Sequence, residues 1–372
     1  MPLLRNRLCG LAHCALPLIG APMLGYSDVS LARAVASTGA IGSVPCSGMA
    51  PGQLCTLVQD NVEHRLCYNF FCHRPPPASM ARPSSSWVGH LAKYYAEEGI
   101  ANPADAVQKR FAALRPTHFT EEHLEALLAV QAGLKGRPPL LLSFHFGLPP
   151  DALWERLRAV AGPAFCVSCS ATTVEEAVYL HQRHVDIVVC QGAEAGGHRG
   201  LFLPGSRVEE QLGTFALVPQ VRAALGAGAC LVAAGGIVDA ATARAAVELG
   251  ADGVQVGTSF LRSAEAKTSL VHRAALRDAR ESGALTTSIT NILSGRPARG
   301  LRNRLMAELG SMRADGPTYP FGPAYLLDLR QRAEASGRGD YSQLWAGQNL
   351  RGCTEGPAAD KAKAIAAAFA NL

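Results

Sequence analysis

The sequence has no uninterrupted apolar run of about 18 or more residues, the length that a helix needs to cross a membrane. It also has no cluster of Lys or Arg. The formal net charge of +5 comes from scattered cations in a chain with only 17% charged residues. Proteins that bind a nucleic-acid backbone carry clustered basic residues interleaved with aromatic ones. Neither a membrane nor a nucleic acid is therefore expected as a partner, whereas a mildly positive surface favours a small anionic ligand.

Motifs of several enzyme classes are also missing. No GxGxxG follows the first expected strand, which disfavours a dinucleotide site of the Rossmann type. There is no GxSxG elbow, and no cysteine has the flanks of a known nucleophile, which argues against a hydrolase. The histidines form no HxH, HExxH or two-His-one-carboxylate pattern. No metal site is predicted.

The eleven cysteines are an odd number, and several lie in apolar, strand-like stretches. These are Cys46, Cys67, Cys72, Cys166, Cys190 and Cys230, which we interpret as reduced core residues. The segment CVSC, with Cys166 and Cys169, resembles a redox or metal motif. Residues i and i+3 of a strand point to opposite faces, however, so we expect two unrelated buried thiols.

Eight short apolar runs, each with Gly, Pro or Ser at or near its end, alternate with helical patterns from Leu16 to about Arg280. The runs are LPLIGAPM (16–23), AIGSVPCSG (40–48), RLCYNFFCH (65–73), PLLLSFHFG (139–147), AFCVSCSA (164–171), DIVVCQGAE (186–194), ACLVAAGGI (229–237) and DGVQVGTSF (252–260). This alternation indicates right-handed βαβ units around a parallel sheet. Eight units predict an α/β protein of the (β/α)8 TIM-barrel class.

Helical patterns behind a Ser, Thr or Asp cap candidate support this interpretation; they occupy residues 30–38, 151–162, 173–184 and 239–250. Residues 73–120 are too long for a simple loop and are expected to form a helical insertion. After Arg280 the alternation of strand-like and helical stretches ends, and residues 294–310 and the tail from Ala324 are expected to be helical. We predict a barrel of residues 1–72 and 121–280, with a smaller, mainly helical cap of residues 73–120 and 281–372.

The active site of such a barrel lies at the C-terminal ends of its strands. Gly235 and Gly236 at strand seven, and Gly257 with Thr258 at strand eight, let backbone N–H groups approach an anion closely, which predicts a phosphorylated ligand. The alternative is that these glycines only allow tight turns. A flavin mononucleotide would place its phosphate there and its ring across the barrel mouth. Groups that would bind the polar edge of the ring are the side chains of Asn69 and Gln191 and the backbones of Ala21 and Met23.

His198 lies in a loop after Gly196 and Gly197, whose small residues let the backbone approach a flat ligand. A histidine with its ordinary pKa of about 6.5 suits removal of a carbon-bound proton or donation to an anionic substrate. The alternative is a loop histidine without a role. For His145 and His73 a place in the core is an equal alternative. The other histidines are expected at the surface: His13, His64, His90, His118, His123, His181, His184 and His272.

Nearly end to end, the chain resembles the nitronate monooxygenases, formerly called 2-nitropropane dioxygenases, and especially their bacterial class I branch. The segments that carry the resemblance are GAPM, YNFFCH, SFHFGLP, QGAEAGGHRG, AAGGI, GVQVGT, TNILSGRPARG and GDYSQLWAGQ. The resemblance implies that FMN is bound by Asn69, Gln191, Gly196, Gly236, Gln255, Val256, Gly257 and Thr258. It also implies that His198 is the catalytic histidine.

The family oxidises alkyl nitronates with O2 to carbonyl compounds and nitrite, and propionate 3-nitronate is a typical substrate of the branch, which implies a detoxifying role. Candidate substrate contacts are His145, His73, Tyr319, Tyr325 and Arg299. Two alternatives remain: an NAD(P)H-dependent quinone or enoyl reductase of the same flavin superfamily, and a flavin-binding accessory protein without catalysis. The protein is expected to be cytoplasmic and a monomer or homodimer.

Overall fold

The computed structural model describes the chain except residues 1–5, 78–81, 114–117, 135, 283–286 and 371–372. Eight parallel strands form its centre: β1 (Leu18–Gly20), β2 (Gly42–Pro45), β3 (Leu66–Phe71), β4 (Leu140–His145), β5 (Phe165–Ala171), β6 (Ile187–Gln191), β8 (Cys230–Ala234) and β9 (Gly253–Val256). Their order is β1-β9-β8-β6-β5-β4-β3-β2. The Ile41 amide donates to the Leu18 carbonyl (2.9 Å), and the Ile41 carbonyl accepts from the Gly20 amide (2.8 Å), which closes the barrel between β1 and β2. The predicted eight-stranded barrel is confirmed.

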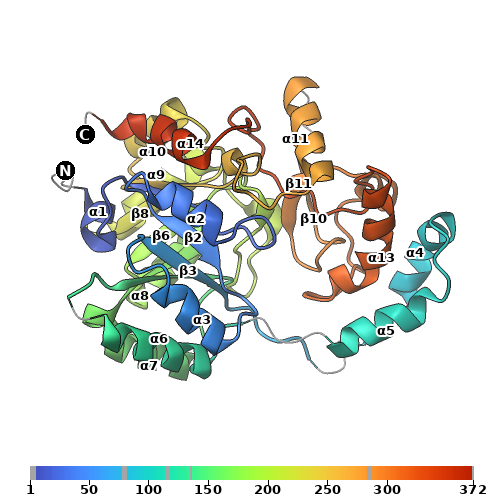
Figure 1. Cartoon of the computed structure of the whole chain (residues 1–372), viewed down its shortest axis with the longest axis horizontal. Helices are drawn as coiled ribbons and strands as arrows, with labels where there is room; N and C mark the ends of the chain where they lie inside the picture. Colours follow the sequence, from blue (N-terminus) through green and yellow to red (C-terminus); the bar gives the residue numbers. More distant parts are fainter. Residues whose placement is uncertain (1–5, 78–81, 114–117, 135, 283–286, 371–372) are drawn as a thin grey trace.

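Helices surround this barrel (Figure 1): α2 (Val29–Ala36), α3 (Pro51–Gln59), α6 (Glu121–Gly133), α7 (Asp151–Ala164), α8 (Val174–Gln182), α9 (Thr214–Leu225), α10 (Ala240–Glu248) and α14 (Ala358–Ala366). Asp28, Thr173 and Asp239 accept hydrogen bonds from the first-turn amides of α2, α8 and α10, as N-caps do. The helix α14 lies in the range expected for the cap, yet its apolar side chains join the core between the strands and the helices.

The apolar core has two layers, because side chains of a strand alternate between its faces. The inner layer fills the barrel and is closed by α1 (Arg7–Ala12), while the outer layer packs under the helices. Cys166 belongs to the inner layer and Cys169 to the outer one, which confirms two unrelated buried thiols. The cysteines in strand-like stretches are free, and of these only Cys72 is partly exposed.

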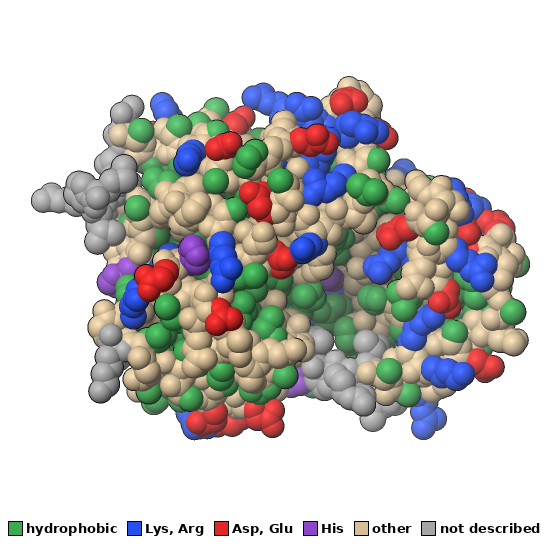
Figure 2. Space-filling view, in the orientation of Figure 1, with side chains coloured by type: hydrophobic (Ala, Val, Ile, Leu, Met, Phe, Trp, Pro, Cys, Tyr) green, Lys and Arg blue, Asp and Glu red, His purple; other side chains and the backbone are tan. Residues whose placement is uncertain are grey.

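A second lobe stands beside the barrel (Figure 1). It contains α4 (Ser85–Glu97), α5 (Pro103–Ala113), α12 (Arg304–Leu309) and α13 (Gly322–Ala335), which share one apolar core. The helix α11 (Leu270–Ser282) projects between the lobe and the barrel (Figure 1). Figure 2 shows the surface hollowed between the two, with hydrophobic side chains in the hollow. Within the described residues, no helix is long and apolar enough to span a membrane.

The prediction of a helix over residues 294–310 is wrong for most of that range. Only α12 is helical there, while β11 (Ala298–Leu301) forms an antiparallel sheet with β10 (Thr287–Thr290) and β7 (Gly197–His198). Pro297 cannot donate inside a helix, and Gly295 has a φ of +95°, so helix formation is blocked before β11. The pairing of Ala298 with His198 joins the loop that carries His198 to the second lobe.

Two histidines expected at the surface are buried instead. His123 is 7% exposed and His272 is 1% exposed. His123 lies on the inner face of α6, where Nδ1 accepts from the Thr120 amide (3.1 Å) and Nε2 donates to the Met49 carbonyl (2.8 Å). His272 packs edge-on against Tyr26, with ring centroids 5.2 Å apart. Polar flanking residues hid the inward position of both side chains.

Candidate active site

A cavity of about 370 Å³ opens at the C-terminal ends of the barrel strands, on the side that faces the second lobe. Its size suits a small molecule or cofactor. The barrel contributes strand ends and the His198 loop, and the region after β10 contributes the opposite wall. The residues of that wall include Ser294, Tyr319, Pro320, Pro323, Gln343 and Trp345. The cavity therefore lies where the sequence places the site of a TIM barrel.

Most of the site residues expected from the sequence line this cavity. They are Ala21, Met23, Asn69, His145, Gln191, Gly196, Gly197, His198, Gly235, Gly236, Gln255, Gly257, Thr258 and Tyr319. The side chain of Val256 points the other way, into the outer core layer. His73 is buried behind Tyr319, with ring centroids 4.9 Å apart.

Tyr325 and Arg299 lie away from the cavity. The Tyr325 hydroxyl accepts from the Ser84 amide (2.8 Å), inside the core of the second lobe. Arg299 is buried and donates from Nε to the Ala193 carbonyl (2.8 Å) and from a terminal nitrogen to Thr287 (3.3 Å). Arg299 thus holds the Gly-rich loop from behind.

The backbone of His198 is fixed by two side chains from the barrel. Its carbonyl oxygen accepts from Gln191 Nε2 (3.0 Å) and from His145 Nε2 (3.2 Å). Gln191 Oε1 accepts in turn from the Gly200 amide (2.8 Å). Because the carbonyl needs a proton on His145 Nε2, His145 Nδ1 is the acceptor of the Ser170 hydroxyl (2.6 Å). The roles of Gln191 and His145 in this structure are therefore to position the loop.

The His198 ring is held by Ser294, whose hydroxyl lies 2.9 Å from Nε2. The same hydroxyl donates to the Arg296 carbonyl (3.1 Å), so it accepts the proton of His198 Nε2. His198 Nδ1 then carries the lone pair, and no hydrogen bond to it occurs among the described residues. The tautomer of His198 thus follows from its neighbour.

The histidines at this site are neutral. Burial lowers the pKa of His198 to about 3, with smaller contributions from His145, Arg296 and His73. Part of the His198 ring faces the cavity, but the ring lies deep enough that desolvation dominates. Burial also lowers the pKa of His145 to about 3 and that of His73 to about 4. Near neutral pH His198 therefore offers a lone pair and an N–H, but no charge.

The loop itself is anchored by Arg199, which is fully buried. Its guanidinium donates to Gln211 Oε1 (2.6 Å) and to the carbonyls of Gly192 (2.8 Å) and Gln191 (2.7 Å). Sequence reasoning missed this residue because an arginine beside a histidine in a loop gives no periodic signal. Arg199 fixes both ends of the turn that presents His198.

Backbone donors gather at the ends of β8 and β9. Gly235 and Gly236 have φ values of +116° and +74°, which only glycine adopts without strain. The amides of Gly236, Gly257 and Thr258 have no hydrogen-bond acceptor among the described residues. A Cβ on Gly257 would lie 3.3 Å from the Cβ of Ala21, so this stretch needs a small residue. These free N–H groups suit an anion such as a phosphate.

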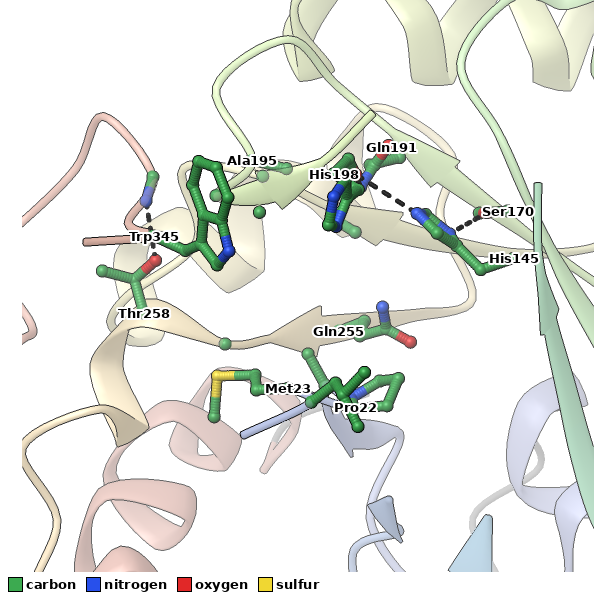
Figure 3. A pocket seen from close by; sticks show the side chains of 18 of the residues that line it. Pro22, Met23, His145, Ser170, Gln191, Ala195, His198, Gln255, Thr258 and Trp345 are labelled. Atoms are coloured by element: carbon green, nitrogen blue, oxygen red, sulfur yellow. Dashed lines mark hydrogen bonds between the residues drawn. The ribbon is translucent and has the colours of Figure 1, made fainter. Parts of the chain in front are cut away.

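Sequence reasoning missed two aromatic side chains near His198: Trp345 lines the cavity, and Phe146 lies behind the cavity wall. Trp345 lies beside His198, with ring centroids 5.6 Å apart. Figure 3 shows Trp345 and His198 on one side of an open space and Pro22 and Met23 on the other. Phe146 packs behind His198, with ring centroids 5.7 Å apart. The slot between these two sides has a shape that suits a flat ring.

The model of the family described as nitronate monooxygenase matches residues 5–364. The chain is 37% identical to a nitronate monooxygenase of Pseudomonas aeruginosa over 359 residues, which covers 95% of both proteins. It is 34% identical to a nitronate monooxygenase of Paraburkholderia phytofirmans over 352 residues, which covers 92% of this chain and 89% of the relative. Among solved structures, nitroalkane oxidase from Streptomyces ansochromogenes superimposes with a TM-score of 0.78 at 29% identity, over 98% of both chains.

Proposed function

The chain belongs to the nitronate monooxygenase family, and we propose that it uses FMN and O2 to oxidise alkyl nitronates to a carbonyl compound and nitrite. It is an oxidoreductase, as its relatives are. The observation that supports the proposal best is the neutral, firmly held His198 beside a slot for a flat ring. A role in removing toxic nitronates such as propionate 3-nitronate is part of the proposal.

The donors of the cavity fit FMN. The free amides of Gly236, Gly257 and Thr258 would hold its phosphate. Asn69 and Gln255 would meet the polar edge of its ring: Asn69 Nδ2 donates to Ser143 (2.8 Å), which leaves its oxygen free, and Gln255 has no partner among the described residues. When bound, FMN supplies electron transfer with the substrate and with O2.

Two of the expected FMN contacts are better explained in another way. Gln191 already uses its amide to hold His198 and Gly200, so we propose that it supports the cofactor site through the loop. Val256 would contribute its backbone alone, because its side chain is in the outer core. Gly196 lets the loop pass close to the tail of the chain, because a Cβ there would lie 2.5 Å from the backbone of Ala346, whereas Gly197 has a φ of +73° and open space beside it.

The protonation state of His198 favours a substrate that is already an anion. A base works best when its pKa lies near the working pH, and a pKa of about 3 makes His198 a weak base. A nitronate needs no proton removed. If the Ser294 hydroxyl rotates to donate to Nε2, the proton of His198 moves to Nδ1 and can be donated to a nitronate oxygen. His198 would then orient the substrate.

Nitrite release tests this function. We expect the FMN-loaded protein to release nitrite from propionate 3-nitronate and from ethyl nitronate in air, without NADH. When O2 is removed, nitrite release and steady loss of the nitronate should both stop. Absence of nitrite from several alkyl nitronates, with FMN bound, contradicts the proposal. Rapid anaerobic bleaching of the flavin by NADH would instead favour a reductase.

A further inference from the structure

The lining of the cavity carries no formal charge: among the described residues it contains neither Asp or Glu nor Lys or Arg. Arg296 is stacked on the aromatic wall of this cavity. We propose that Arg296 is a specificity-determining residue, whose positive charge behind the aromatic wall makes the cavity favour an anion over a neutral molecule of the same shape. For a nitronate this inference rests on the proposed function, but the preference for an anion does not.

Arg296 is stacked on the wall of the site. Its guanidinium carbon lies 4.1 Å from the ring centroid of Phe146 and 5.8 Å from that of Tyr319. The Phe146 ring contacts the rings of His198 and Tyr319, with centroids 5.7 and 5.6 Å away. Both of these residues line the cavity. The cation is thus one aromatic layer away from a bound ligand, and the stacking holds it in place.

The charge of Arg296 is not neutralised by an ion pair. One terminal nitrogen donates to the Leu201 carbonyl (2.6 Å), and no carboxylate of the described residues lies within salt-bridge distance. Glu176 attracts it from further away, but that carboxylate is already occupied by Thr172 and the Phe202 amide. A half-buried cation without a counter-ion costs free energy. An anion in the neighbouring cavity would offset that cost.

The histidines and the tyrosine around Arg296 add no positive charge. Burial keeps the pKa of His198 and His145 at about 3 and that of His73 at about 4, so these rings are neutral. Burial also raises the pKa of Tyr319 well above its ordinary value, so its hydroxyl stays protonated. Two further buried cations, Arg199 and Arg299, hold the loop from its other side, and Glu194 attracts both of them. Arg296 is therefore the cation stacked on the aromatic wall, where the low local dielectric strengthens its effect.

A charge-matched pair of inhibitors tests the inference. Propionate has a planar anionic group like that of a nitronate, and propionamide has the same shape without the charge. In Arg296→Gln we expect the inhibition constant of propionate to rise about tenfold, the order expected for one charge at this range. That of propionamide should change less than about twofold, because no charge acts on it. Arg296→Lys should restore most of the propionate binding.

The matched control is Arg302→Gln, which removes an exposed arginine of the same segment and should leave both constants unchanged. If Arg296→Gln does not fold, Arg296→Met is measured in its place, because the Met side chain keeps an unbranched apolar stem against Phe146. Equal weakening of both inhibitors, or no change in either, overturns the inference. Because inhibitor binding can be followed by the flavin spectrum without turnover, charge selectivity without nitrite release would refute the proposed function alone.

Discussion

Gln191 and His145 donate hydrogen bonds to the same atom, the carbonyl oxygen of His198, over 3.0 and 3.2 Å. They come from the ends of β6 and β4 and so tie the His198 loop to two separate strands of the barrel. On its other side the loop pairs with β11. The ring of His198 is therefore fixed by its backbone as much as by Ser294.

Removal of the Gln191 amide should weaken this arrangement. In Gln191→Leu the His198 carbonyl loses one donor and the Gly200 amide loses its acceptor, both in a buried region. The His198 carbonyl keeps the hydrogen bond from His145, whereas the Gly200 amide is left unpaired, which costs about 1–3 kcal/mol. We expect a lower free energy of unfolding in urea and a lower kcat on nitronates. Gln255→Leu is the control: Gln255 lines the same cavity without a partner among the described residues, so stability should change little. Equal stability of the two variants contradicts this explanation.

His198→Asn separates the two roles considered for this residue. A base is needed only when the substrate is a neutral nitroalkane, and general-base catalysis contributes about 10²–10⁴-fold. Because a pKa of about 3 makes His198 a weak base, we expect activity on nitroethane and on ethyl nitronate to fall to a similar extent, by less than about tenfold. Nitrite release from both substrates measures this. A loss on nitroethane at least about a hundredfold larger than that on ethyl nitronate would show that His198 acts as a base.

The barrel could be predicted from the sequence because each strand is a short apolar run with its own local signal. The sheet around His198 could not, since β11 pairs with residues about a hundred positions earlier and ARGL has no strand-like pattern. Arg299 of SGRPARG is a candidate substrate contact from the sequence, yet Arg296 of the same segment lies at the aromatic wall. Only the turn before β11 decides which of them faces the site.

Stability should depend on pH through the buried histidines. Burial lowers four pKa values, to about 3 for His145 and His198 and to about 4 for His73 and His272. These folded-state pKa values lie below the unfolded-state value of about 6.5. At a pH between the folded-state and unfolded-state pKa values, the unfolded chain therefore binds more protons than the folded one. The free energy of unfolding should be level above about pH 7 and fall as the pH drops from 6.5 towards 4, by up to about 1.4 kcal/mol per pH unit for each histidine.

Urea unfolding at a series of pH values measures this dependence. His272→Leu removes one of the four groups at a position 1% exposed. We therefore expect a shallower slope between pH 6.5 and 4, whatever the variant's stability at pH 7.5. A free energy of unfolding that is level down to pH 4.5 would mean that these rings gain protons without a penalty.

The turn after β8 should decide how well FMN is retained. Gly236→Ala places a side chain at a φ of +74°, which costs roughly 1–2 kcal/mol, and moves the free amide that we assign to the phosphate. We expect the dissociation constant of FMN, measured by flavin fluorescence, to rise at least about tenfold.

Gly205→Ala separates backbone strain from the loss of a phosphate donor. Gly205 has a φ of +85°, nothing within 4 Å of its added Cβ, and an exposed position outside the cavity lining. Gly205→Ala has about the same conformational cost as Gly236→Ala and should lower the free energy of unfolding by a similar amount. FMN should bind to it as to the unmodified protein. If both variants lose FMN equally, the loss reflects general destabilisation. If neither does, the phosphate lies elsewhere, and the free amides at the ends of β8 and β9 need another ligand.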